Sequence, residues 1–126
     1  AAEDVCLGRP GCYPGYSAAI AVTSDYVLAG SNEGWLRAFD IDNGEVLWEF
    51  DTTQAFTAVD GRIAQGGSIG GGQAPLIVGD RLILNSGYAF AGKMPGNALL
   101  VFKLPASDAQ VAAGSGAQVL QESAAK

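Results

Sequence analysis

Short apolar runs separated by residues that favour tight turns fill most of this 126-residue sequence. Runs of this length, with a turn roughly every eight to ten residues, are typical of antiparallel strands. The first group of predicted strands is 17–23, 26–30, 35–40 and 46–50. The turns between them contain Gly34 and Gly44, so this group is predicted to form a four-stranded antiparallel meander.

The second half of the chain repeats the pattern only in part. Residues 53–73 show no clear alternation, and the strands predicted after them are 74–78, 81–85 and 97–104. From residue 105 onward the composition changes to Ala, Ser, Gln and Gly, which predicts a tail. The chain therefore carries one complete four-stranded unit and three strands of a second.

Strands of this kind cannot cover both faces of their own sheets. An open antiparallel sheet leaves apolar edges exposed, whereas a radial array of four-stranded blades covers them. We therefore predict an all-β fold with about two four-stranded antiparallel blades, the last lacking one strand, of a larger β-propeller. The predicted parts are a disulfide-bearing loop over 1–16, a full blade over 17–56, a glycine-rich connection over 57–73, a closing partial blade over 74–104 and a mobile tail over 105–126. An independent small β-domain is the alternative.

Composition argues against several classes of function. The net charge is −6 and the sequence shows no basic stripe, so no nucleic-acid partner is predicted. No apolar run approaches the roughly 18 residues of a membrane span. Histidine is absent, which removes Ser/His/Asp and Cys/His nucleophiles and His-ligated zinc.

The chain has two cysteines, Cys6 and Cys12, and turn-forming residues lie between them. A disulfide between them would close a small loop and would indicate a periplasmic or extracellular compartment. Two free buried thiols are the alternative. Two thiols are too few for a structural zinc site on their own.

Two motifs invite a ligand but depart from the known patterns. The glycine-rich segment 66–72 lacks the Lys of a phosphate-binding loop. The acidic segment that starts at Asp40 has Asp51 where a calcium loop has Glu, and a hairpin turn explains it without a metal. For Trp35 and Trp48 we favour packing between blades over stacking on a ligand. No pair of carboxylates stands out, so no catalytic residue is predicted.

The spacing of Ala38, Asp40, Gly44 and Trp48 resembles the tryptophan-docking motif of quinoprotein propellers. A longer resemblance, over roughly residues 6–104, is to the C-terminal part of polyvinyl-alcohol-dehydrogenase-like proteins. This family is a branch of the dehydrogenases that use pyrroloquinoline quinone (PQQ). The segments that carry this longer resemblance include 17–19, 29–31, 34–40, 48–52, 66–72, 85–88 and 95–102.

The resemblance implies an eight-bladed propeller with PQQ and calcium in a central funnel. The activity implied is a periplasmic or secreted alcohol dehydrogenase that oxidises secondary alcohols to carbonyls and passes electrons to a cytochrome. The calcium ligands and the catalytic base are expected in blades outside this segment, so the remaining blades or a larger partner chain are required. We predict that Tyr16, Ser17, Gly67 and Ser68 face the cofactor, because they precede the innermost strands of their blades. The alternative function is a non-catalytic propeller that acts as a binding or assembly scaffold.

Overall fold

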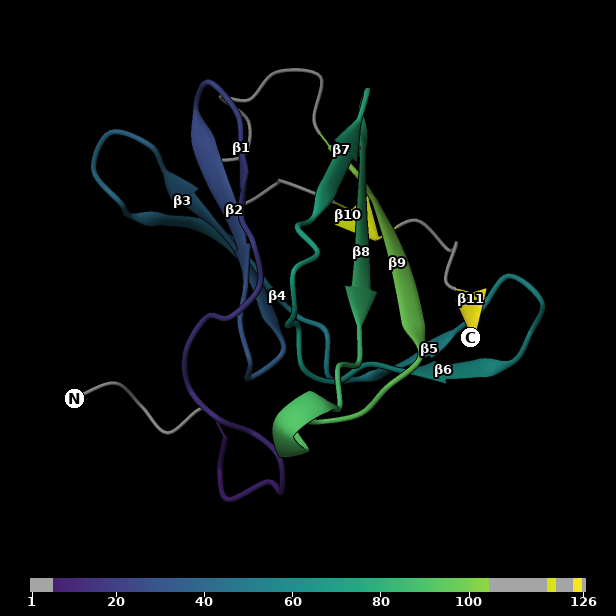
Figure 1. Ribbon diagram of the computed structural model, residues 1–126. Helices are drawn as coiled ribbons and strands as arrows, with labels where there is room; N and C mark the ends of the chain where they lie inside the picture. The colour runs from purple at the N-terminus through teal and green to yellow at the C-terminus, as the bar shows by residue number, and fades with distance from the viewer. Residues whose placement is uncertain (1–5, 105–117, 120–123, 126) are drawn as a thin grey trace.

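The computed structural model describes residues 6–104, 118–119 and 124–125, and its strands form three antiparallel sheets (Figure 1). Sheet I has the order β1-β2-β3-β4, and β5 pairs with β6 in a separate hairpin. Sheet II has the order β10-β9-β8-β7, with β11 also paired to β9. The bounds are β1 Ala21–Val22, β2 Tyr26–Gly30, β3 Trp35–Asp40, β4 Val46–Asp51, β5 Ala55–Thr57, β6 Ile63–Gln65, β7 Leu76–Val78, β8 Arg81–Ser86, β9 Ala98–Lys103, β10 Gln118–Val119 and β11 Ala124–Ala125, with a 3₁₀ helix η1 at Phe90–Gly92. The predicted all-β fold class is confirmed.

Local turn chemistry closes the hairpins of sheet I. The carboxylate oxygen Oδ1 of Asp40 accepts the backbone N–H groups of Asp42 at 2.8 Å and Asn43 at 3.2 Å. Gly44 then has a φ of +76°, a conformation that favours glycine. This turn reverses the chain between β3 and β4, as the sequence predicts.

The strand predicted over 17–23 is shorter in the structure. Only Ala21–Val22 pair with β2. The hydroxyl of Ser17 instead donates to the side-chain carbonyl of Asn32 at 2.7 Å. The chain just before it is also held there, because the Asn32 N–H donates to the Gly15 carbonyl at 2.8 Å. The segment before β1 is therefore bound to the β2–β3 turn rather than to the sheet.

Sheet II contains the three strands predicted for the second blade. Its strand β7 begins at Leu76, directly after Pro75, which has no N–H to donate to a ladder. The short strands β10 and β11 both pair with β9 at the edge opposite β7. The rest of the tail predicted over 105–126 lies outside the described residues.

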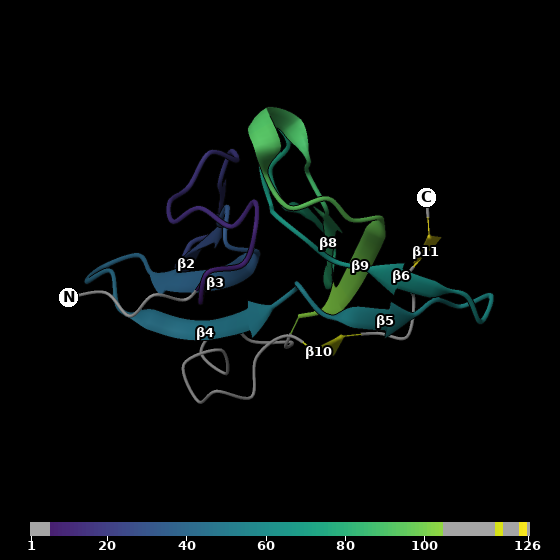
Figure 2. The same cartoon turned by 90° about the horizontal axis from the view of Figure 1, so that it is seen from below.

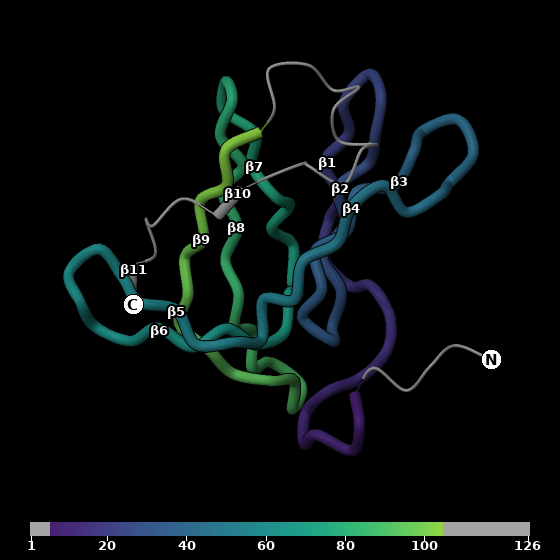
Figure 3. Tube along the Cα trace, turned by 180° about the vertical axis from the view of Figure 1, so that it is seen from behind, coloured from purple at the N-terminus to yellow at the C-terminus, as the bar shows by residue number. Residues whose placement is uncertain are grey.

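The β5–β6 hairpin was not predicted from the sequence. It lies within the segment 53–73 and links the two larger sheets along the chain (Figure 3). Its turn contains Asp60 and Gly61, and Gly61 has a φ of +83°. Strands of three residues are too short to show alternation, so this Asp-Gly pair was the available signal.

Sheets I and II face each other across the main hydrophobic core. The buried side chains on these inner faces include Tyr26, Leu28, Leu36 and Ala38 from sheet I and Leu82, Leu84, Leu100 and Phe102 from sheet II. The ring of Phe102 meets Trp48 edge-on at 5.7 Å and Phe50 edge-on at 5.2 Å between centroids. The predicted packing of Trp48 between the sheets is confirmed, whereas Trp35 lies on the opposite face of sheet I.

The two sheets have matching local geometry. In sheet I the N–H of Ile41, just after β3, donates to the carbonyl of Asp25, just before β2, at 3.1 Å. In sheet II the N–H of Leu104, just after β9, donates to the carbonyl of Asp80, just before β8, at 2.7 Å. Strands β2 and β3 therefore correspond to β8 and β9, residue by residue.

This correspondence shows that the sheets meet head to tail. Leu28, on the inner face of sheet I, corresponds to Ile83, which pairs with Leu76 on the outer face of sheet II. Each sheet thus uses a different face for the contact, and one face of each remains free. The free faces carry exposed apolar side chains, with Val22 58% exposed on sheet I and Leu76 and Val78 55% and 56% exposed on sheet II. Head-to-tail contacts of this type form a closed ring where the rotation between neighbouring units closes.

Candidate functional site

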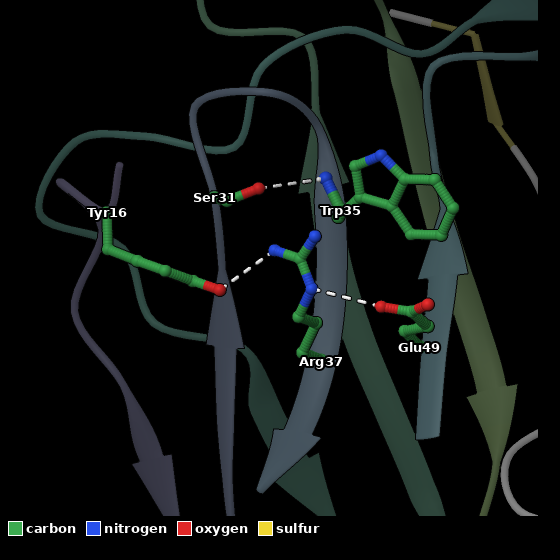
Figure 4. Close-up of polar contacts among 5 residues, drawn as sticks. All are labelled: Tyr16, Ser31, Trp35, Arg37 and Glu49. Atoms are coloured by element: carbon green, nitrogen blue, oxygen red, sulfur yellow. Dashed lines mark hydrogen bonds and ion pairs between the residues drawn. The ribbon is translucent and has the colours of Figure 1, made fainter. Parts of the chain in front are cut away.

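A cluster of polar and aromatic side chains lies on the outer face of sheet I (Figure 4). Arg37 on β3 donates from Nε to the carboxylate of Glu49 on β4 at 3.1 Å. It also donates from Nη1 to the hydroxyl of Tyr16 at 2.8 Å. Its guanidinium carbon lies 5.6 Å from the ring centroid of Trp35. Arg37 and Glu49 are cross-strand partners, so the register of β3 and β4 creates the ion pair.

The contacts of Arg37 keep its charge fixed. Partial burial lowers the pKa of Arg37, but the hydrogen bonds to Tyr16 and Glu49 and their electrostatic interaction outweigh burial. The pKa of the guanidinium is therefore raised above its ordinary value. The cluster presents a permanent cation beside two aromatic rings. Such a group can bind or orient a carboxylate or another face of the protein, but it cannot exchange protons near neutral pH.

Two of the four residues predicted to face a cofactor lie close together, because the hydroxyls of Ser17 and Ser68 both donate to Asn32. Tyr16 and Ser17 are exposed and precede β1, as predicted. Gly67 and Ser68 are buried in the link before β7. A Cβ atom at Gly67 would lie 2.3 Å from the carbonyl oxygen of Pro95, so only glycine fits there.

The hydroxyl of Ser68 is used entirely within the protein. It donates to the carbonyl of Asn32 at 2.6 Å and accepts the N–H of Met94 at 3.0 Å. The hydroxyls of Thr52 and Ser86 form a second buried contact, 2.7 Å apart. These bonds join the β2–β3 turn, the end of β4, the link before β7 and the loop after η1. The structure thus gives Ser68 a role in holding the two sheets together.

A groove of about 760 Å³ lies on the outer face of sheet II, between the glycine-rich link and β8. Its walls include the segment 70–75, Leu76 and Ile83. Tyr88 packs against the glycines, because a Cβ atom at Gly70 would lie 2.7 Å from its ring. The side-chain amide of Asn85 donates to the Gln73 side chain at 3.1 Å.

The predicted disulfide between Cys6 and Cys12 is present. Both sulfur-bearing residues are buried and pack with Met94. The loop between them lies directly on η1, at the same end of the molecule (Figure 2), since a Cβ atom at Gly11 would come within 2.8 Å of the Gly92 carbonyl oxygen. The disulfide therefore fixes the N-terminal loop against the loop that follows β8.

Within the described ranges, no group of three or more His, Cys, Asp or Glu side chains is placed to bind a metal ion. No helix in the part of the chain that the structure describes is long and apolar enough to cross a membrane.

Curated proteins with similar sequences are alcohol dehydrogenases. A polyvinylalcohol dehydrogenase of Pseudomonas sp. is 42% identical over 79 residues, which are 62% of this chain and 12% of that protein. A 1-butanol dehydrogenase (quinone) of Thauera butanivorans is 33% identical over 108 residues, covering 79% of this chain and 16% of that protein. A quinoprotein ethanol dehydrogenase of Pseudomonas aeruginosa is 31% identical over 106 residues, with the same shares. No family model matches the chain, and no solved structure does.

This chain is homologous to quinoprotein alcohol dehydrogenases. The predicted resemblance is confirmed. The chain spans only 12% to 16% of the length of these relatives. Of the residues predicted to face PQQ, Ser68 is buried with its hydroxyl bonded within the chain, and the hydroxyl of Ser17 donates to Asn32.

Two features of the structure were not predicted from the sequence. The first is the pairing of Arg37 on β3 with Glu49 on β4. The alternation of the two predicted strands contained this signal. The groove over Asn85 had no sequence signal, because it depends on how the glycine-rich link folds back on Tyr88.

Proposed function

We propose that this chain forms two adjacent blades near the C-terminal end of the propeller of a PQQ-dependent alcohol dehydrogenase. The observation that carries the proposal is the head-to-tail contact of sheets I and II in a chain that is homologous to quinoprotein alcohol dehydrogenases. The outer face of each sheet corresponds in position to the inner face of the other sheet, and that inner face is already covered. Further blades, from the same polypeptide or from a larger partner chain, complete the ring, which has eight blades in all.

The reaction proposed for the complete protein converts a secondary alcohol to a carbonyl compound. The alcohol would lose a hydride equivalent, with its two electrons, from carbon and a proton from oxygen, and PQQ would supply the two-electron acceptor. A cytochrome then receives the electrons. The catalytic base and the calcium ligands come from the remaining blades. The disulfide supports a periplasmic or secreted location, since such bonds persist in oxidising compartments.

In this proposal, residues of the chain have different roles. Tyr16 and Ser17 lie before the innermost strand β1 and are exposed, so they are the residues of this chain proposed to face the cofactor funnel. Gly67 and Ser68 have a positioning role, because their buried hydrogen bonds hold the glycine-rich link in place before the innermost strand β7.

The test is reconstitution of the complete protein with PQQ and calcium. The expected result is a quinone absorption band that stays with the protein through gel filtration, together with dye-linked oxidation of a secondary alcohol. Removal of calcium by a chelator should abolish that oxidation, and added calcium should restore it. A complete propeller that binds no quinone and oxidises no alcohol would contradict the proposal and would favour a binding or assembly scaffold.

A further inference from the structure

The groove on the outer face of sheet II is lined by a side chain whose oxygen lacks a hydrogen-bond donor among the described residues. The side-chain oxygen Oδ1 of Asn85 is buried and has no hydrogen-bond partner among the residues that the structure describes. The amide nitrogen of the same side chain donates to the side chain of Gln73 at 3.1 Å. A buried carbonyl oxygen without a donor is costly, so either water or another protein group must supply a donor to it.

The position that corresponds to Asn85 in sheet I is Gly30, and there the structure shows what fills the space. Gly30 pairs with Leu36 in sheet I, as Asn85 pairs with Leu99 in sheet II. Ile69, from the link before β7, packs directly on Gly30. A Cβ atom at Gly30 would lie 2.3 Å from Cγ2 of Ile69.

The backbone of Ile69 is also bound to sheet I. Its N–H donates to the carbonyl of Ser31, the residue after Gly30, at 3.1 Å. Ile69 is only 2% exposed. The link before sheet II therefore covers the end of sheet I, and this contact is called the seal below. Ser86 follows Asn85 as Ser31 follows Gly30. The geometry of this seal therefore has a counterpart on the outer face of sheet II.

The two positions differ in the space they leave. Gly30 has no side chain, and a whole isoleucine fits against it. Asn85 occupies part of the same space with a polar side chain. The residue that seals sheet II must therefore be smaller than isoleucine, and it must supply a hydrogen-bond donor where Ile69 supplies methyl groups.

We propose that the groove over Asn85 receives the link that precedes the inner strand of the neighbouring blade. This link carries serine, a small residue with a hydroxyl donor, at the place of Ile69. It donates one hydrogen bond to Oδ1 of Asn85 and one backbone N–H to the carbonyl of Ser86. The groove is thus a blade-to-blade seal rather than a site for a soluble ligand. The inference rests on the ring architecture of the proposed function, but not on its chemistry.

The first test measures whether the groove is covered in the complete protein. Leu76 lines the groove and is 55% exposed in this chain, and Val59, in the β5–β6 turn, is 67% exposed. Leu76→Cys and Val59→Cys would each be treated with a maleimide dye without reductant, and labelling of the parent protein would be subtracted. We expect the thiol at position 76 to react more than about tenfold slower than that at position 59. A ratio below tenfold would show an open groove and overturn the proposal.

The second test measures whether a donor meets Asn85. Asn85→Leu removes the oxygen and also the bond to Gln73, and Gln73→Leu removes only that bond, so it is the matched control. If a donor is present, Asn85→Leu strands it, and the thermal midpoint of the complete protein should fall by about 0.7–2 °C below that of Gln73→Leu. A smaller fall, an equal midpoint or a higher one would show that the oxygen has no partner and would refute the proposal.

Quinone absorption and alcohol oxidation would be measured on the same preparations. A covered groove in a protein without quinone would leave the seal intact and reject the proposed function. An open groove in an active, quinone-bearing enzyme would support the proposed function and reject the seal.

Discussion

The contact between Gly30 and Ile69 gives the sharpest prediction of how the two blades are joined. In Gly30→Ala the new methyl group would lie 2.3 Å from Cγ2 and 2.9 Å from Cβ of Ile69, so the side chain or the link must move. Overpacking of this kind costs about 1–3 kcal/mol, partly offset by about 0.5–1 kcal/mol because alanine loses less entropy than glycine on folding. The net expected loss is therefore about 0–2.5 kcal/mol of unfolding free energy, and the clash itself, about 1–3 kcal/mol, is the part that appears as coupling.

A double-mutant cycle isolates this contact. Ile69→Ala alone removes a buried side chain and should cost about 2–5 kcal/mol. In the double variant the methyl group added at position 30 enters the space that Ile69 has left, so the clash disappears. The double variant should therefore be no less stable than Ile69→Ala, which corresponds to a coupling of at least about 1 kcal/mol.

The assay is urea unfolding of the complete protein, followed by fluorescence of Trp48 at the interface of the two sheets. Val59→Ala is the control, because Val59 lies in the β5–β6 turn, away from the groove, and is 67% exposed. It should change the unfolding free energy by less than about 0.5 kcal/mol. Additive effects of Gly30→Ala and Ile69→Ala, within about 0.5 kcal/mol, would refute the claim that these residues meet.

Three further predictions follow from buried or charged contacts. Ser68→Ala should lower the unfolding free energy by about 1–3 kcal/mol in urea, since it strands two buried backbone groups, and a loss under about 0.5 kcal/mol would contradict this. Replacing Cys6 and Cys12 by serine should cost about 2 kcal/mol through the entropy of the opened loop, and equal melting of the two proteins under non-reducing conditions would show that the bond is not formed. The hydrogen bonds and charge of Arg62 lower the pKa of Asp60, so this exposed pair contributes stability that is present above the ordinary carboxyl pKa and lost as the pH falls through the lowered one. Arg62→Gln should raise the pKa of Asp60 in an NMR titration, and an unchanged value would count against the pair.

Local patterns account for the parts of the fold that the sequence predicts well. The strands of sheet I and sheet II follow from alternation and from turns such as the one that ends at Gly44, because strands pair with their neighbours in the chain. The disulfide also follows from local spacing. The β5–β6 hairpin has three-residue strands, and only the Asp60–Gly61 turn marks it.

Non-local packing accounts for the parts that could not be predicted. That Ser68 faces a cofactor stays a prediction, and its hydrogen bonds to Asn32 and Met94 could not be predicted because these residues are distant in the sequence. The orphan oxygen of Asn85 is visible only when the glycine-rich link is seen folded against Tyr88. No sequence pattern encodes such a three-dimensional contact directly.

The head-to-tail contact explains why exposed apolar residues lie on opposite sides of the molecule. Val22 is exposed on the outer face of sheet I, and Leu76 and Val78 are exposed on the outer face of sheet II. Exposed apolar surface of this kind marks an interaction site. In a ring, each of these faces would meet the counterpart that the inner faces have already found.

The most direct test of the central claim is calorimetry and sedimentation of residues 1–126 expressed alone. If the chain is two blades of a larger ring, the isolated polypeptide should not form a cooperatively melting monomer, and it should associate or lack a heat-absorption peak. A monomer of 12.8 kDa with a sharp transition and an unfolding enthalpy near the roughly 0.7 kcal/mol per residue of autonomous domains would contradict the claim. In that case the free faces would belong to a self-sufficient domain.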